Sequence, residues 1–338
     1  MTTANSRKGQ RPTIYDVAQR AGVSKSLVSL VLTGSPLVKP DKRVAVLAAI
    51  QELGYRPNRA ASTLASRQTK SIGLVIDDYR NLWFVSLLNG MQSELESQGY
   101  RVAVADARAD AGPGGGAVDR FLSMRVDGLV IAMEPLDSML QATGTPTVVA
   151  GWRDRLPEGA EFIANDDEAG GRLAAEHLLE LGHRRIGHLT GTGGAATHRR
   201  SGFSAACDSA GIGFRMQGEG HGTTEEDGYQ AALALLADYP GATAIFAAND
   251  TMAVGALAAI KGRGLSVPHD ISVIGYDNSP LAQSRYLDLT SIDGKSEEIG
   301  VLTAQALLAR IDDPSRKPQR TLVQPAAVIR GTTAPAPA

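Results

Sequence analysis

The sequence predicts an α/β protein in which an N-terminal, all-α helix-turn-helix head precedes two doubly wound parallel-sheet lobes. Two short amphipathic helical segments, joined by a glycine-containing turn, lie close to the N-terminus and predict the head. From residue 71 onward, short apolar runs alternate with helical stretches, which is typical of βαβ units and parallel sheets. About 260 residues are long for one open sheet, so we expect two lobes.

The charge is distributed unevenly along the chain of 338 residues, whose net charge is only -2. Residues 1–70 contain twelve Lys and Arg against three Asp and Glu, which gives +9, and the remainder carries -11. A small basic head on an acidic body is expected to contact a polyanion with the head alone. The alternative is a basic surface that is merely solvated.

The first two helices are predicted over residues 13–34. Thr13 can cap the first helix, with Asp16 in the position that completes a capping box. Gly22 can end that helix, and Ser24 can cap the second one. The residues expected to face inward are Ile14, Val17, Ala18, Ala21, Val28 and Val31. An ordinary helical hairpin is the alternative interpretation.

A third helix is expected to begin at Pro40 and to stop at Gly54. Its inner side is predicted to be formed by Val44, Leu47 and Ile50.

Motifs along nearly the whole chain resemble the LacI/GalR family of bacterial transcription regulators, and they occur in the order found in that family. They read IYDVAQRAGVS, LGYRPNRAASTLA, SIGLVI, ELGHRRIGHLTG, RRSGF, AIFAANDTMAVGAL and GLSVPHDISVIGYDNSPLA. The resemblance implies a cytoplasmic transcriptional repressor, not an enzyme, that binds a pseudo-palindromic DNA operator as a homodimer. It also implies a small-molecule effector, either a sugar derivative or a nucleobase or nucleoside.

The resemblance places the second helix in the major groove of DNA. Lysine can donate to the acceptor atoms of guanine, and serine can donate or accept. The positions implied in the head are Thr13, Tyr15, Ser24, Lys25, Ser26 and Ser29. The chain departs from the common family pattern at Leu30 and Thr33, so either the preferred half-site differs or Leu30 packs against the third helix.

Residues 58–66 resemble the family's hinge helix. Asn58 can cap this helix, Arg59 can reach a phosphate, and Ala61 permits close approach to DNA. Leu64 matches a leucine that is wedged into the minor groove, where it kinks the duplex. The alternative is a plain linker.

The body is expected to adopt the two-lobed architecture of periplasmic binding proteins that this family uses. Strands are predicted at 71–76, 100–105, 128–132, 147–151, 185–189, 243–248 and 271–276. Helices are predicted near 84–98, 169–181, 225–237 and 251–261. The expected divisions are a disordered tail (1–12), the head (13–57), the hinge helix and linker (58–70), a first lobe (71–164 and 293–322), a second lobe (165–292 and 323–330) and a disordered tail (331–338).

Ligands of open α/β sheets bind beyond the carboxyl ends of the strands, and several polar and aromatic residues are predicted there. The candidate effector-binding residues are Trp83, Phe84, Trp152, Arg199, Asn249, Asp250 and Asp277. Arg199 is expected to precede a helix formed by 200–207. As alternatives, Asp250 caps the helix that follows it, and either tryptophan belongs to the core.

Other classes of protein are less consistent with the sequence. A single cysteine, Cys207, excludes an intrachain disulfide and a cysteine-based zinc site, and no metal or cofactor is expected. There is neither a secretory signal nor an apolar run of the ~20 residues that a membrane helix needs. GTGGAA (191–196) loosely fits a dinucleotide fingerprint, so an enzyme is the main rival, and a transport-type binding protein is the third class.

Overall fold

The computed structural model describes residues 12–32, 34–56, 68–107, 116–141 and 143–337. The chain forms two compact units, Met1–Thr69 and Lys70–Ala338. No helix within the described ranges is long and apolar enough to cross a membrane.

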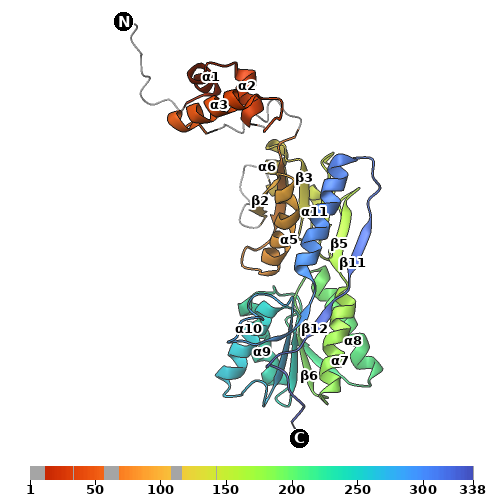
Figure 1. Ribbon diagram of the computed structural model, residues 1–338. Helices are drawn as coiled ribbons and strands as arrows, with labels where there is room; N and C mark the ends of the chain where they lie inside the picture. Colours follow the sequence, from red (N-terminus) through yellow and green to blue (C-terminus); the bar gives the residue numbers. More distant parts are fainter. Residues whose placement is uncertain (1–11, 33, 57–67, 108–115, 142, 338) are drawn as a thin grey trace. The chain divides into compact units, whose positions relative to one another are not determined.

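The first unit is a three-helix head with the predicted helix-turn-helix. Its helices are α1 (Ile14–Ala21), α2 (Lys25–Leu32) and α3 (Pro40–Leu53), shown in Figure 1. The predicted capping box is present, because the Thr13 backbone N–H donates to Asp16 Oδ2 at 2.7 Å and the Asp16 N–H donates to Thr13 Oγ1 at 3.4 Å. Gly22 ends α1 in the left-handed conformation, with φ of 65°.

The inner face predicted for α3 is right at Ile50, which packs against the core of the head, and wrong at the other two residues. Val44 and Leu47 are 68% and 52% exposed, whereas Val46 and Ala49 are buried against Val17, Val28 and Val31. Both registers of the segment follow a helical period, and only the packing against α1 and α2 selects between them.

The first lobe of the body is a six-stranded, all-parallel sheet in the order β11-β5-β4-β3-β1-β2. The strands are β1 (Ser71–Ile76), β2 (Arg101–Asp106), β3 (Gly128–Ile131), β4 (Thr147–Ala150), β5 (Glu161–Asn165) and β11 (Arg320–Val323). The helices are α5 (Trp83–Ser97), α6 (Ala117–Ser123), the short 3-10 helix η1 (Asp137–Met139) and α11 (Ser296–Asp312).

Helices cover both faces of this sheet. Alternate residues of β1 point to opposite faces. Ile72 and Leu74 pack against Leu87 of α5 and Leu307 of α11, whereas Val75 packs against Phe121 of α6. Figure 1 shows α5 and α11 side by side on the same face.

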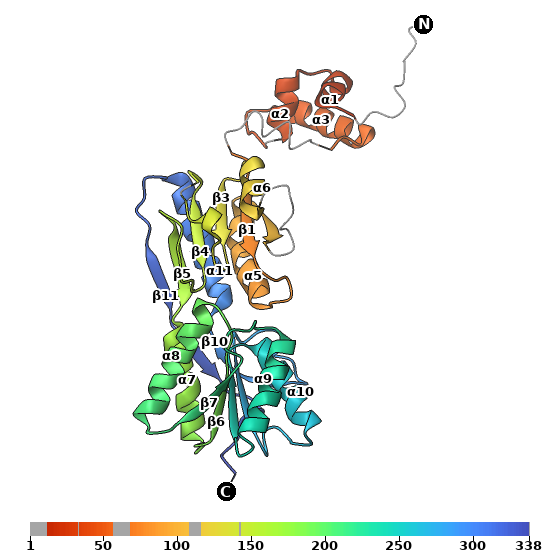
Figure 2. The ribbon, with the colours of Figure 1, turned by 180° about the vertical axis from the view of Figure 1, so that it is seen from behind.

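The second lobe is also six-stranded, in the order β12-β10-β9-β8-β6-β7. Its strands are β6 (Ile186–Leu189), β7 (Phe214–Gln217), β8 (Ala244–Ala247), β9 (Ser272–Tyr276), β10 (Thr290–Asp293) and β12 (Ala326–Val328), of which β12 alone is antiparallel. Helices α7 (Asp167–Glu180) and α8 (Gly194–Ser209) cover one face, and α9 (Glu225–Asp238) and α10 (Asp250–Gly262) cover the other, as Figure 2 shows. The predicted fold class, with two doubly wound lobes, is therefore confirmed.

Three chain segments join the two sheets. They connect β5 to α7, β10 to α11, and β11 to β12. Each lobe is consequently built from separate stretches of the sequence, and the cleft between the lobes lies beside these connections.

The predicted disordered tail at 331–338 is wrong for residues 331–337. Thr332 Oγ1 accepts from the Thr290 N–H at 2.9 Å and donates to the Val273 carbonyl at 2.7 Å, and the Ala336 N–H donates to the Leu181 carbonyl at 2.8 Å. The pairing of β9 with β10 begins only at Ile274, so the preceding residue of β9, Val273, has its backbone groups free to bond to Thr332 of the tail. A small-residue composition does not prevent such ordering, because these bonds need no large apolar side chain.

Candidate functional site

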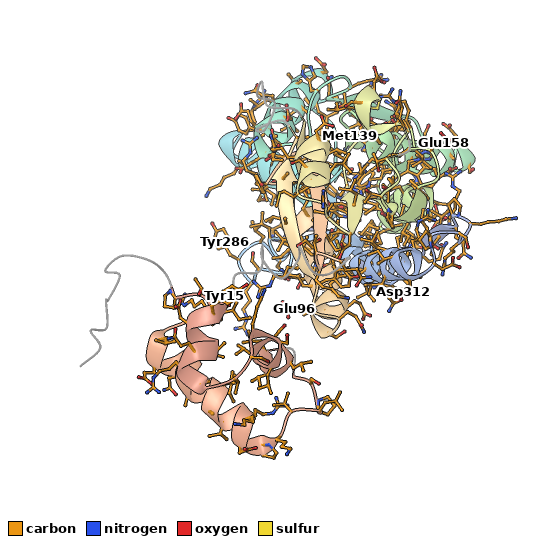
Figure 3. All side chains as sticks on the ribbon, turned by 90° about the horizontal axis from the view of Figure 1, so that it is seen from above. Tyr15, Glu96, Met139, Glu158, Tyr286 and Asp312 are labelled. Carbon is orange, nitrogen blue, oxygen red and sulfur yellow. The ribbon has the colours of Figure 1, made fainter. Side chains whose placement is uncertain are left out.

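The exposed side of α2 carries the predicted DNA-contact residues. Ser24, Lys25, Ser26 and Ser29 are all exposed. Lys25 Nζ lies 3.5 Å from the Tyr15 hydroxyl oxygen and 5.1 Å from the centroid of its ring. Tyr15 itself is 64% exposed and is labelled in Figure 3. Thr13 is also exposed and forms the cap of α1.

Leu30 does not pack into the head. Leu30 is 42% exposed and lies outside the apolar core of the three helices. The alternative that Leu30 packs against the third helix is therefore wrong. The exposed side of α2 therefore presents an apolar side chain beside Ser26 and Ser29. Thr33 and the hinge residues Asn58, Arg59, Ala61 and Leu64 lie outside the described residues.

A cavity of about 140 Å³ lies between the two lobes, and residues of both lobes line it. Six of the seven predicted effector-binding residues line this cavity: Trp83, Phe84, Trp152, Arg199, Asn249 and Asp277. The topology brings them together because the loops and helix beginnings that carry them follow the carboxyl ends of parallel strands in both sheets.

Asp250 is the exception among those seven residues. Its side chain is directed away from the cavity, where Oδ1 accepts from Ser291 Oγ at 2.6 Å and Oδ2 accepts from the Ser279 N–H at 2.7 Å. Burial raises the pKa of Asp250 to about 6. The cap of α10 is Asn249, whose Oδ1 accepts from the Met252 N–H at 2.7 Å, so the capping alternative for Asp250 is wrong as well.

Arg199 is the centre of a buried polar network. Its Nε donates to Asp167 Oδ1 at 2.7 Å, its Nη1 donates to the Ala248 carbonyl at 2.6 Å, and its Nη2 lies 3.2 Å from Asp277 Oδ1. The guanidinium lies 3.6 Å from the centroid of the Tyr276 ring. Each end of the guanidinium is therefore already paired within the protein.

Arg199 lies within α8 and does not precede a helix as predicted. The helix begins at Gly194, because the short sequence after the glycines contains good helix formers and no proline. This earlier start places Arg199 in the second turn, on the side of α8 that faces α7.

Asp277 directly follows β9 in a strained conformation. Its φ of 97° lies in the left-handed region, which non-glycine residues rarely adopt outside functional sites. Burial raises the pKa of Asp277 to about 7, although the neighbouring Arg199 opposes that rise. A carboxyl group with such a pKa can exchange between charged and neutral forms near neutral pH.

The aromatic residues belong both to the core and to the cavity wall. Trp83 and Phe84 are 9% and 6% exposed and meet edge to face at 5.2 Å between ring centroids. Trp152 packs edge to face on Phe162 at 5.4 Å and lies 4.0 Å from the ring of His198. A ligand in the cavity would therefore contact rings that are held rigidly by packing.

Sequence reasoning missed several polar residues of the cavity, among them Asn165, Asp167 and Arg153. Asn165 ends β5 in the first lobe, and its Nδ2 donates to Asp167 Oδ1 at 2.8 Å and to the Tyr276 hydroxyl oxygen at 2.7 Å. It thereby connects the first lobe to β9 of the second. Arg153 donates from Nη1 to the Trp152 carbonyl at 2.6 Å and lies 5.7 Å from the centroid of the Trp83 ring. The sequence did not predict β5, the strand that Asn165 ends, because β5 begins with a glutamate and ends with an asparagine.

A wider cavity of about 920 Å³ adjoins the inner one, since Asp77, Asn81, Thr192 and Thr223 line both. It is rich in carboxylates, which are contributed by Asp77, Asp78, Glu225, Glu226 and Asp227, with Arg80 as the cation. The way into the inner cavity from this side is therefore acidic.

Two protein-family models match the chain. Residues 13–58 match the model described as bacterial regulatory proteins, lacI family, and residues 175–333 match the periplasmic binding protein-like domain. The transcriptional regulator CelR of Thermobifida fusca is 33% identical over 335 residues, which cover 95% of this chain and 98% of that protein.

Two solved structures extend this similarity to three dimensions. The lac repressor dimer bound to operator and the anti-inducer ONPF is 30% identical with a TM-score of 0.79, and the match covers 96% of this chain and 100% of that one. The complex of CelR with cellobiose is also 30% identical, with a TM-score of 0.68, and covers 95% and 100%.

Proposed function

This chain belongs to the lacI family of bacterial regulatory proteins, and from that premise we propose that it represses transcription under the control of a small molecule. The head binds DNA, and the body is a ligand-binding domain of the periplasmic-binding-protein type. In the proposal, two copies of the head read a pseudo-palindromic operator, and an effector binds in the cavity between the lobes. A bacterial repressor acts on chromosomal DNA, so the proposal places the protein in the cytoplasm and gives it no catalytic role.

The observation that carries this proposal is the cavity between the lobes, with Arg199 and Asp277 in its wall. A molecule that contacts both lobes binds more tightly to one relative orientation of the lobes than to another, and so shifts the population toward it. Because the coupling is reciprocal, an effector that changes operator affinity must itself bind differently when the operator is present.

The chemistry of the cavity favours a small polyhydroxylated effector, a sugar or sugar derivative. A carboxylate, an amide and flat aromatic rings are the groups that orient a polar ring in a pocket. Cellobiose is the molecule bound in the CelR complex, which is consistent with this class. A nucleobase or nucleoside is the second candidate, because the aromatic Trp152 lines the cavity and is only partly buried.

The proposed DNA contacts follow from the exposed side of α2. Lys25, Ser26 and Ser29 would read base edges in the major groove, and Tyr15 would contact the DNA backbone. Arg59 is assigned to phosphate, and Leu64 to a base step that is opened from the minor groove.

Selection from randomised double-stranded DNA tests the DNA-reading part of the proposal. The wild-type protein should enrich a pseudo-palindromic sequence, and the double variant Lys25→Ala, Ser26→Ala should enrich a different one, because one base contact is worth about 1–3 kcal/mol. Lys42→Ala is the matched control, since Lys42 is exposed on α3 and its loss removes the same charge. An unchanged preference in the double variant would reject the assignment of α2, and a monomer in light scattering would reject the proposed symmetry.

A further inference from the structure

The exposed side of α2 carries one apolar side chain to which the proposed DNA contacts give no role. Leu30 is 42% exposed and lies outside the apolar core of the head, whereas Val28 and Val31 of the same helix are buried in that core. Residues three and four positions apart are neighbours on a helix surface, so Ser29 and Leu30 both lie next to Ser26, one turn further along α2. Leu30 is therefore part of the surface that faces the bases in the proposed function.

The surroundings of Leu30 favour a nucleic acid over an apolar protein surface as its partner. Its exposed neighbours on α2 are the hydroxyl groups of Ser26 and Ser29 and the ammonium group of Lys25. Helix α2 contains no acidic residue, and residues 1–70 carry a net charge of +9. A polyanion complements this charge, whereas an apolar partner would bury the hydroxyl and ammonium groups without hydrogen bonds, which is unfavourable. The partner of this surface must therefore combine negative charge, polar edges and one apolar group.

Double-stranded DNA offers such an apolar group in the major groove at thymine, whose C5 methyl group points into the groove. Adenine, guanine and cytosine present hydrogen-bond donors and acceptors there. The Leu30 side chain is a hydrocarbon that neither donates nor accepts, so it would remove water from a polar base edge without replacing the lost hydrogen bonds. Contact with a methyl group instead buries apolar surface on both partners, which is favourable.

The geometry of α2 limits where this thymine lies in the half-site. Leu30 follows Ser26 by four residues, which is about 6 Å along the helix axis. Successive base pairs of DNA are about 3.4 Å apart. The base pair that Leu30 contacts is therefore expected within about two steps of the base pair that Ser26 reads.

We propose that Leu30 is a specificity-determining residue of the head, and that it contacts the C5 methyl group of a thymine in each half of the operator. This inference rests on the proposed DNA-reading function of α2 and adds the chemical identity of one base in the half-site. It assigns recognition of that base to apolar contact, whereas Lys25, Ser26 and Ser29 read their bases through hydrogen bonds.

Selection from randomised double-stranded DNA locates the base, with the full-length wild-type protein and Leu30→Ala selected in parallel. The wild type should enrich thymine at one position of each half-site, and Leu30→Ala should accept other bases there while it keeps the remaining positions. Leu47→Ala is the matched control, because Leu47 is 52% exposed on α3, where no DNA contact is proposed, and the same atoms are removed. Leu30→Ala is expected to fold, since Leu30 lies outside the core and alanine is a good helix former.

Deoxyuridine at the selected position removes the methyl group alone and keeps every hydrogen-bonding atom of the base pair. Burial of one methyl group is worth about fourfold in affinity, so this exchange in both half-sites should weaken wild-type binding by about fifteenfold. Leu30→Ala should bind the two operators with nearly equal affinity, and Leu47→Ala should respond as the wild type does.

Methylated DNA distinguishes thymine from the other base with a C5 methyl group. Cytosine at the selected position should weaken wild-type binding, and 5-methylcytosine should recover only part of the loss, because it restores the methyl group and not the O4 acceptor of thymine. Tighter binding to 5-methylcytosine than to thymine would overturn the assignment to thymine.

Equal affinity of the wild type for the thymine and deoxyuridine operators would overturn the inference. An equal loss in the wild type and in Leu30→Ala, or a selection in which no thymine depends on Leu30, would do the same. Failure of the wild type to enrich any sequence would instead reject the proposed function. The two failures are distinguishable, because the methyl exchange leaves the hydrogen bonds of Lys25 and Ser26 to the bases unchanged.

Discussion

Replacing Gly171 by alanine should disturb both stability and the polar network of the cavity. Helices α7 and α8 approach closely where their small residues face each other. A Cβ atom on Gly171 would lie 1.9 Å from the backbone oxygen of Arg199, and one on Gly202 would lie 1.8 Å from that of Glu168. Since ordinary contact begins at 3.4 Å, the Gly171→Ala variant requires α8 to move by the difference, about 1.5 Å.

The expected loss of stability follows from two opposing effects. Overpacking in a close interface costs about 1–3 kcal/mol. Alanine is favoured over glycine within a helix by about 1 kcal/mol, which offsets part of that cost. We therefore expect the free energy of unfolding to fall by up to about 2 kcal/mol. The displaced backbone belongs to Arg199 itself, so its contact with Asp277 and the affinity for effector should weaken too.

Urea denaturation followed by circular dichroism measures this loss, and Gly262→Ala provides the control. Gly262 ends α10, and a Cβ atom there would have no heavy atom within 4 Å. The control should be as stable as the wild type or up to about 1 kcal/mol more stable. If Gly171→Ala is as stable as the control and binds effector normally, the argument from close helix packing is refuted.

Three further results are expected. The pKa of Asp277 is raised from 3.8 to about 7 in the folded protein, so the stabilising contribution of its protonated carboxyl is complete below pH 3.8 and is lost as the pH rises to about 7. Urea denaturation at several pH values should therefore show the free energy of unfolding falling across this range, and Asp277→Asn should make that fall smaller. Thr332→Val should lower the free energy of unfolding by about 1–3 kcal/mol, because it leaves the buried Thr290 N–H and the Val273 carbonyl without their partner. Thr332→Ser keeps the hydroxyl and should be about as stable as the wild type. Equal stability of the two variants would contradict this account. Operator affinity should fall steeply with salt, and Arg59→Ala should weaken binding to all sequences alike and flatten that dependence; a sequence-selective loss would contradict a phosphate contact.

The parts of the fold that were predicted correctly depend on local signals. The cap at Thr13, the left-handed Gly22 and the apolar run that became β1 each act within a few residues, so the sequence displays them directly. The polar site was predicted where a strand signal preceded it, as at Asp277, which follows β9.

The remaining site residues were missed because long-range contacts define them. Asn165 becomes part of the site through the Tyr276 hydroxyl, 111 positions later, and Asp167 through Arg199, 32 positions later. Asp250 illustrates the opposite error, since it follows a strand end as predicted, but Ser279 and Ser291 turn its carboxylate away from the cavity. Periodicity and motif spacing contain no information about such pairings.

The discontinuous construction of the first lobe imposes an order on its completion during synthesis. Strand β1 and helix α5 leave the ribosome early, whereas α11 and β11, which cover one face and extend one edge of the same sheet, follow strands β6 to β10 and helices α7 to α10 of the second lobe. Until residue 312 has been made, Leu74, Leu87 and Met91 lack the apolar partners that α11 supplies, among them Ile299 and Leu307. Nascent chains therefore expose this apolar face for most of translation, which makes it a natural target for chaperones and a source of aggregation in prematurely terminated chains.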